Sequence, residues 1–316
     1  MYINATGYYI PSVRIDNAHF LPLNGLTDEW IVRRTGIHTR SHVAEGEGHN
    51  SMGLDAIRNA IPSLPYDIKD VDLIVSAAYS AYDTVATLAH EAQREFDIDG
   101  AKAVYLSSAC SSFINGLEMV DAYFASGKSS KALLVCSECN SYYANETDKT
   151  CGHLWGDAAV AFFLSKDPCG DHEPVISSIY TCGLGNVSKG PEGVKLRPKE
   201  GGIMMPFGKD VFLNACNYMI DALDKAGAAV GGIKAAELDH IICHQANLRI
   251  VANVAHQLGL PMEKFENNID ELGNTGSAGV ALVFSQRRDT FAPGEKIGLT
   301  VFGGGYSCGA ALIEMK

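Results

Sequence analysis

The chain has no apolar run near the roughly 20 residues that a membrane-spanning helix needs. Its longest apolar runs, AAVAFFL and KALLVC, have the length of buried strands. The opening residues, MYINATGYYIPSVRI, have no basic segment followed by an apolar core, as a secretory signal would have. These absences argue against a membrane or exported protein, and we expect a cytoplasmic protein with no membrane partner.

Positive charge is also scarce. The chain has 25 Lys and Arg against 37 Asp and Glu, a net charge of −12. Because a nucleic-acid binder needs a basic face, we expect no nucleic-acid partner. Among nine cysteines, Cys136 and Cys139 form one CSEC pair, but no second pair follows at zinc spacing, and no P-loop motif is present. Metal binding and nucleotide hydrolysis are therefore disfavoured, and free thiols indicate a reducing compartment.

Alternation of strand-like and amphipathic stretches dominates what is present, and it indicates an α/β fold. VDLIVSAAYS near residue 71 resembles LDHIICHQAN near residue 238, and each precedes a small-residue helix and another strand. We interpret this as an internal duplication, with halves at 1–165 and 166–316. Ordinary α/β alternation is the alternative. The segment 183–207 is rich in Gly, Pro and charge, which predicts a long connection between the halves.

Cys110 lies in SSACSSF, after an expected strand at 103–106. An expected helix follows, and its apolar face consists of Phe113, Leu117, Val120 and Phe124, with Gly127 at its end. Unpaired N–H groups and the positive dipole at a helix start stabilise a thiolate. Small neighbours leave room for a substrate. Cys110 is therefore a candidate nucleophile, and an inert core cysteine is the alternative.

Two further corners carry polar residues. His244 follows an expected strand at 241–243, at a strand end of the kind where active sites of α/β folds gather. Asn274 lies at the corresponding corner of the second half, and the stretch FGGGYSCGAAL runs from a strand into three glycines. Glycine backbone can approach a ligand closely and turn N–H groups toward it. A hydrogen-bonded core histidine, a helix cap and a tight turn are the alternatives.

Four stretches of the chain, taken in order, resemble the β-ketoacyl-acyl carrier protein synthase III family. They are SSACSSF, CHQANLRI, GNTGSAG and FGGGYSCGAAL. DEWIVRRTGIHTR at 28–40 and WGDAAVAFFL at 155–164 are also similar, so the resemblance covers nearly the whole chain. It implies a thiolase-like α/β fold in which two duplicated βα halves form five layers, αβαβα. It also implies a homodimer with coenzyme A thioesters as substrates and no metal or bound cofactor.

The resemblance further implies a condensing enzyme that starts fatty acid synthesis. Cys110 would take the acyl group of an acyl-coenzyme A, and the N–H groups of Cys110 and Gly304 would form the oxyanion hole. His244 and Asn274 would then hydrogen-bond the thioester carbonyl of malonyl-acyl carrier protein during its decarboxylation. Phe302 matches a family phenylalanine beside the nucleophile and would favour loss of carbon dioxide.

By the same resemblance, Trp30 would stack on the adenine of coenzyme A. The rest of the nucleotide and pantetheine arm would contact Arg34, Lys149, Asn247 and Arg249. Val85 stands where the family often has an aromatic residue that crosses the dimer and limits the acyl pocket, so the pocket would be roomier or differently shaped. His256 and Gln257 replace basic residues that usually meet an acidic carrier protein. The starter and the carrier-docking residues stay open.

Three alternatives compete with a starter-unit enzyme. A related condensing enzyme could serve a specialised polyketide or polyene pathway with an unusual acyl starter. A cysteine hydrolase using Cys110 and His244 would release the acyl group without forming a carbon–carbon bond, but it leaves Asn274 and the glycine stretch without a role. A catalytically silent scaffold is disfavoured by the intact Cys–His–Asn set.

Overall fold

A nine-stranded mixed β-sheet, in the order β11-β12-β13-β8-β1-β7-β6-β4-β5, organises the computed structural model, which describes residues 1–316. The five strands at one end of this order are β1 (Tyr2–Tyr9), β4 (Leu73–Ala77), β5 (Lys102–Leu106), β6 (Lys131–Cys139) and β7 (Asp157–Ser165). The four strands at the other end are β8 (Val175–Gly183), β11 (His240–Cys243), β12 (Lys296–Gly303) and β13 (Ser307–Glu314). A single residue pair, Tyr2 and Val175, joins β1 to β8, so two smaller sheets meet there at their edges.

The two groups of strands repeat the same pairing pattern. β4 is parallel to β6, which is antiparallel to β7, which is antiparallel to β1. β11 is likewise parallel to β12, which is antiparallel to β13, which is antiparallel to β8. β5 extends the first set beyond β4, whereas the second set has only one parallel bridge there, between Ile241 and Phe265. The duplication is confirmed; the boundary at 165/166 stays a prediction, and it falls between β7 and β8.

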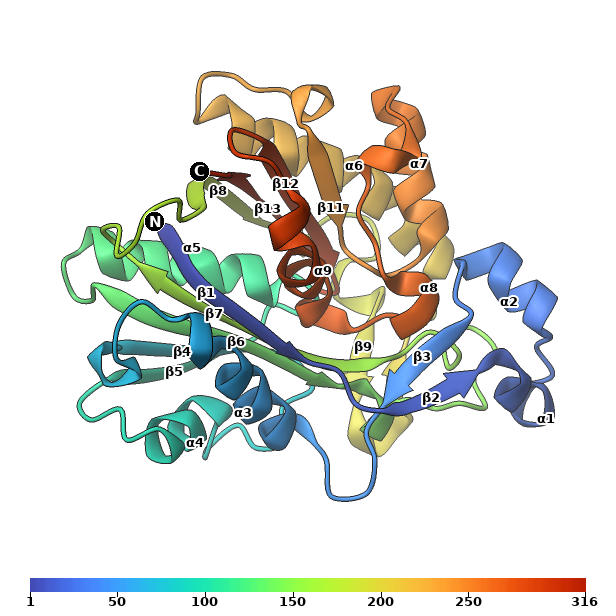
Figure 1. Cartoon of the computed structure of the whole chain (residues 1–316). Coiled ribbons are helices and arrows are strands. Elements are labelled where there is room, and N and C mark those ends of the chain that lie inside the picture. Colours follow the sequence, from blue (N-terminus) through green and yellow to red (C-terminus); the bar gives the residue numbers. More distant parts are fainter.

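Helices complete five layers (Figure 1). The outer face of the first sheet is covered by α3 (His49–Ala60) and α4 (Leu88–Glu95), and that of the second by α6 (Gly208–Ala228) and α7 (Leu248–Leu258). Between the sheets lie α5 (Ser112–Ala125) and α9 (Gly279–Arg287). Phe162 of β7 links them, because its ring lies 5.0 Å from that of Phe113 and 5.9 Å from that of Phe284. The predicted α/β architecture is confirmed.

A small lobe extends from one end of the molecule (Figure 1). It consists of β2 (Val13–Asp16), α1 (Phe20–Asn24), α2 (Asp28–Thr35) and β3 (Thr39–His42), with α8 (Ile269–Leu272) beside β3. Gly36 ends α2 with a φ of 77°, and a Cβ there would lie 2.6 Å from that of Leu248 on α7. Glycine therefore lets α2 approach the start of α7.

The segment 183–207 is a long connection, but its predicted place between the halves is wrong. It follows β8, which pairs with β13 of the second half, and it leads into α6 of the same half. Part of it folds into a two-stranded sheet of β9 (Lys195–Arg197) and β10 (Gly202–Met204). No helix of the molecule combines the length and apolar character that crossing a membrane requires.

The layer between the sheets gives a stability prediction. Leu117 of α5 is fully buried there, so Leu117→Ala removes a side chain that close packing cannot replace. We expect the free energy of unfolding to fall by about 2–5 kcal/mol, measured by urea denaturation. Leu213→Ala, on the exposed face of α6, is the control, with a change within about 0.5 kcal/mol. Equal losses in both variants would contradict the assignment of the core.

Candidate active site

Cys110 lies in the turn between β5 and α5, immediately before the helix, as predicted. The turn is tight: Ala109 has a φ of 52°, which is unusual for a residue with a Cβ. The Ser112 hydroxyl accepts from the Ser108 N–H at 2.9 Å and donates to the Ala109 carbonyl at 2.6 Å. These two hydrogen bonds hold the turn in this conformation and so fix the direction of the cysteine side chain. Cys110 is 9% exposed.

The glycine stretch after β12 packs directly on this turn. A Cβ on Gly303 would lie 2.9 Å from the Cys110 nitrogen and 3.0 Å from the Ser111 nitrogen, so only glycine fits. The hydroxyls of Ser111 and Ser307 are 2.6 Å apart and join the two segments. The backbone N–H groups of Gly304 and Cys110 both act on the Cys110 sulfur. They are the pair that the family resemblance implies for an oxyanion hole, and that role stays a prediction.

Burial controls the charge state of Cys110. Burial is the largest cause that raises the pKa of this thiol, and the nearby Glu138 carboxylate adds to it. The N–H groups of Gly304 and Cys110 and the Tyr79 hydroxyl lower it, and together these effects raise the pKa to about 12. The expected stabilisation of a thiolate by the helix start is therefore outweighed. A thiol with so high a pKa is neutral at physiological pH.

His244 follows β11 directly, as predicted from the sequence. Its N–H donates to the Thr300 carbonyl at 2.8 Å, which fixes the residue against β12. Burial lowers the pKa of His244 to about 4, so its ring is neutral at physiological pH. Nδ1 is buried with no hydrogen-bond partner in the protein. A neutral imidazole with an unpartnered nitrogen suits a role in hydrogen bonding rather than in charge pairing.

Asn274 lies between α8 and the short helix Gly276–Ala278, not at the start of a long helix. Its N–H donates to the Leu154 carbonyl at 2.8 Å, and its carbonyl accepts from the Gly156 N–H at 3.0 Å. The side-chain Oδ1 accepts from the Gly276 N–H at 3.0 Å. The amide is therefore oriented, and its NH₂ group is the end left for a substrate.

One cavity brings these groups together. Its lining includes Cys110, His244, Asn274, Phe302 and Gly304. A second, mostly apolar cavity lies against Cys110 as well, and its walls include Tyr79, Trp155, Val194, Leu196 and Ile203. The first cavity contains polar groups of the kind that can hydrogen-bond a carbonyl, whereas the second has mostly apolar walls. Cys110 lies between them.

The residues expected to bind coenzyme A come from two neighbouring helices and a loop. On α2, the Arg34 guanidinium lies 5.1 Å from the Trp30 ring centroid. Asn247 caps α7 by accepting the Arg249 N–H at 2.9 Å, so its side chain is engaged in the fold. Ala246 and Ile250 line the cavity of His244, which places the start of α7 at its edge.

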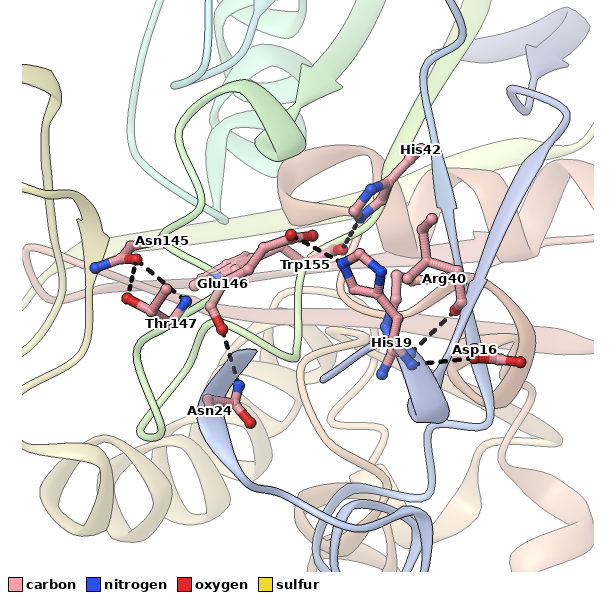
Figure 2. Close-up of polar contacts among 10 residues, drawn as sticks. Asp16, His19, Asn24, Arg40, His42, Asn145, Glu146, Thr147 and Trp155 are labelled. Atoms are coloured by element: carbon pink, nitrogen blue, oxygen red, sulfur yellow. Dashed lines mark hydrogen bonds and ion pairs between the residues drawn. The ribbon is translucent and has the colours of Figure 1, made fainter. Parts of the chain in front are cut away.

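Lys149 belongs to a loop that is held against α1. The Asn24 side chain donates to the Glu146 carbonyl at 2.8 Å, and a His19 ring nitrogen lies 2.9 Å from the Glu146 carboxylate (Figure 2). A ring nitrogen of His42 lies 3.2 Å from the Trp155 carbonyl (Figure 2). This contact fixes the loop between β6 and β7 at its β7 end. The coenzyme role of Lys149 and of the α2 and α7 residues stays a prediction.

Val85 is not brought to the cavity of its own chain. It lies between β4 and α4 and is 84% exposed. Its expected role depends on a second copy of the chain and stays a prediction.

The structure also adds residues that sequence reasoning missed: Tyr79, Trp155, Glu138 and Asn140. The only available signal was the charged residue within the apolar strand KALLVCSEC.

Models of 3-oxoacyl-(acyl-carrier-protein) synthase III match residues 99–182 and, for its C-terminal region, residues 229–315. A β-ketoacyl-acyl carrier protein synthase III of Sodalis glossinidius is 33% identical, with 99% of this chain and 98% of the relative aligned. The chain belongs to the β-ketoacyl-acyl carrier protein synthase III family. The predicted family is confirmed.

Solved structures agree with this membership. A 3-oxoacyl-(acyl-carrier-protein) synthase III from Aquifex aeolicus superposes with a TM-score of 0.90 at 28% identity, covering 99% of both chains. The priming β-ketosynthase of the R1128 polyketide pathway superposes with a TM-score of 0.85 at 26% identity, covering 99% of this chain and 96% of the other. The predicted thiolase-like arrangement is confirmed by these family members.

The buried state of His244 gives a pH prediction. An unfolded histidine titrates near 6.5, whereas burial lowers the pKa of His244 to about 4. We expect the NMR signal of its ring to stay constant from pH 8 to pH 5.5, with His244→Gln used to assign it. Because the unfolded form binds the proton first, His244 lowers the free energy of unfolding as pH falls below 6.5. A midpoint near 6.5 in the folded protein would refute the buried neutral state.

Proposed function

We propose that this protein is a β-ketoacyl-acyl carrier protein synthase III that joins an acyl-coenzyme A starter to malonyl-acyl carrier protein and so begins fatty acid synthesis. The observation that carries the proposal is the convergence on one cavity of Cys110, His244, Asn274 and the glycine turn. A thiol beside two backbone N–H groups suits acyl transfer, and two oriented donors suit a developing enolate.

In the first step, the Cys110 sulfur attacks the thioester carbonyl of acyl-coenzyme A. The carbonyl oxygen becomes negative in the tetrahedral intermediate, and the N–H groups of Cys110 and Gly304 stabilise it. The intermediate then expels the coenzyme A thiolate, which takes up the proton that Cys110 has lost. The acyl chain, now a thioester of Cys110, extends along the apolar walls of the second cavity.

In the second step, malonyl-acyl carrier protein loses carbon dioxide, and the electron pair of the broken bond forms an enolate. The neutral His244 ring and the Asn274 NH₂ group hydrogen-bond the enolate oxygen. The enolate carbon attacks the acyl-cysteine, and Cys110 leaves as a thiolate that takes up a proton from solvent, because its own proton left with coenzyme A in the first step. Phe302, buried in the same cavity, keeps water from the carboxylate that is lost.

These steps use side chains and backbone groups of the chain alone, with coenzyme A entering as part of the substrate. We assign Trp30 to the adenine of that substrate. The pantetheine arm and phosphates are assigned to Arg34, Lys149, Asn247 and Arg249. Four of these five residues come from α2 and the start of α7, which pack together beside the cavity.

We also propose a homodimer and a cytoplasmic location. β5 is a terminal strand of the sheet with a partner only on its β4 side, and it therefore offers an open edge to a second copy. Tyr82 and Val85, in the loop after β4, are large apolar residues that one copy leaves exposed, so a partner would bury them. All nine cysteines are free thiols, as a reducing compartment favours.

Incubation with a panel of short, branched, long and aromatic acyl-coenzyme A thioesters, read by intact-mass spectrometry, tests the nucleophile. We expect one acyl adduct, absent in Cys110→Ala and retained in the surface control Cys169→Ala. His244→Ala and Asn274→Ala should keep the adduct but lose at least about 100-fold in formation of the β-ketoacyl product from malonyl-acyl carrier protein.

The preferred starter separates the pathways. An acetyl or short branched preference supports fatty acid initiation, and a long or aromatic preference supports a specialised pathway. Free acid in place of a β-ketoacyl product would mean a hydrolase and would overturn the proposal. Absence of any adduct on Cys110 would overturn starter transfer from coenzyme A.

The coenzyme A assignment predicts a change in KM. Arg249→Ala and Arg34→Ala each remove a cation from the proposed nucleotide site, so KM for the acyl-coenzyme A should rise about 5- to 10-fold at low salt, with less effect on kcat. Arg58→Ala is the matched control, because Arg58 pairs with Asp55 and Glu95 on α3 and α4. An unchanged KM in both site variants, measured by steady-state kinetics, would contradict the assignment.

A further inference from the structure

Glu138 is a fully buried carboxylate near the end of β6, and none of the mechanistic steps above uses it. It makes no ion pair with Lys, Arg or His. Burying a carboxylate without a cation is costly, and an apolar residue in its place would often leave the fold equally stable. Stability alone therefore does not account for an acid in the apolar strand KALLVCSEC.

Backbone and hydroxyl donors surround the carboxylate instead. On one side, it accepts from the backbone N–H groups of Tyr79 at 3.2 Å and Ser80 at 3.0 Å, and from the Ser80 hydroxyl. On the other side, it accepts from the Ser277 hydroxyl, with the Ser277 N–H at 3.4 Å. The loop after β4 belongs to the first half, whereas Ser277 belongs to the second. One side chain thus joins the two halves.

Both joined segments contribute to the cavities. Tyr79 lines the apolar cavity beside Cys110, and its hydroxyl donates to Asn140 Oδ1 at 2.8 Å. Ser277 lies three residues after Asn274, whose carbonyl accepts from Asn140 Nδ2 at 3.2 Å. The end of β6 therefore holds the enolate-binding amide through Asn140 and Ser277, and the wall of the acyl cavity through Tyr79.

We propose that Glu138 is a positioning residue for the condensation step: its carboxylate holds the Asn274 segment and the Tyr79 wall at fixed positions relative to Cys110. This inference rests on the proposed function, since it assigns the effect to the step in which Asn274 acts. It predicts that acyl transfer to Cys110 tolerates loss of the charge better than condensation does.

Electrostatics support the proposal with a second observable. Burial raises the pKa of Glu138 to about 7, against hydrogen bonds from Ser277 and Ser80 that favour its ionised form. The titratable groups that face it are Tyr79, Tyr105, Tyr143, Cys110, Cys136 and Cys139, and none of them carries a positive charge. Its negative charge opposes ionisation of Cys110, so removing that charge should make the thiol easier to ionise.

Glu138→Gln tests the proposal, because it keeps the shape of the side chain and removes the charge. We expect kcat for β-ketoacyl formation from malonyl-acyl carrier protein to fall about tenfold, which is what weakening one charge-assisted hydrogen bond costs. Single-turnover acylation of Cys110 should change less than threefold. Alkylation of Cys110 by iodoacetamide, followed by peptide mass spectrometry, should shift its pH profile to lower pH.

Glu173→Gln is the matched control. Glu173 is also a buried glutamate held by hydrogen bonds, from Asn4 at 2.7 Å and the Cys169 N–H at 2.8 Å, but neither of these partners lines either cavity. It should leave kcat and the alkylation profile unchanged. Ser277→Ala removes one donor to Glu138 but no charge, and we expect a loss of about threefold in kcat with an unchanged alkylation profile.

Wild-type kcat in Glu138→Gln would overturn the proposal whatever the alkylation profile, as would equal losses in Glu173→Gln. A loss of acylation as large as the loss of condensation would also overturn it. If Glu138→Gln does not fold, as judged by thermal melting, Ser277→Ala decides the outcome by its kcat. Should the wild-type protein form no β-ketoacyl product, the proposed function fails, while the alkylation profile still tests the charge of Glu138 on Cys110.

Discussion

The contact between a glycine and the nucleophile turn is the constraint on which the site depends. Gly303, at the end of β12, meets the backbone of Cys110 so closely that a methyl group would overlap it. This contact joins the second half of the duplicated fold to the first at the reacting atom. It also places the Gly304 N–H beside the sulfur, which no side chain could do as compactly. An extra carbon at Gly303 would therefore disturb the fold and the chemistry together.

The duplication divides the chemistry between the halves. The turn after β5 contains the proposed nucleophile, Cys110, whereas the turns after β11 and α8 contain His244 and Asn274. Neither half alone contains the set of groups that one cavity collects. Contacts across the boundary, such as those of Ser111 with Ser307 and of Glu138 with Ser277, therefore govern the reaction geometry. Their effect on rate can exceed their effect on stability.

The pattern of apolar residues within short windows of the sequence was enough to predict the elements that hold two site residues. The apolar spacing after Cys110 predicted α5, and the apolar run at 241–243 predicted the strand that His244 follows. The sequence could not show that burial outweighs the helix start at Cys110, since burial is a property of the whole fold. Glu138 was missed because its partners Ser80 and Ser277 are about 60 and 140 positions away in the chain. No window around residue 138 contains that information.

The unequal repeat has a consequence for assembly. In the first half, β5 ends the sheet with a full row of unpaired backbone groups, whereas in the second half the matching strand has shrunk to one bridge at Phe265. A molecule with two open edges could add copies without limit, as fibres do. The segment at Phe265 leaves only part of the β11 edge covered, whereas the β5 edge has no partner at all. In the proposed homodimer, antiparallel pairing of β5 with its counterpart would consume the β5 edge of both copies. Growth by strand addition would then stop at two.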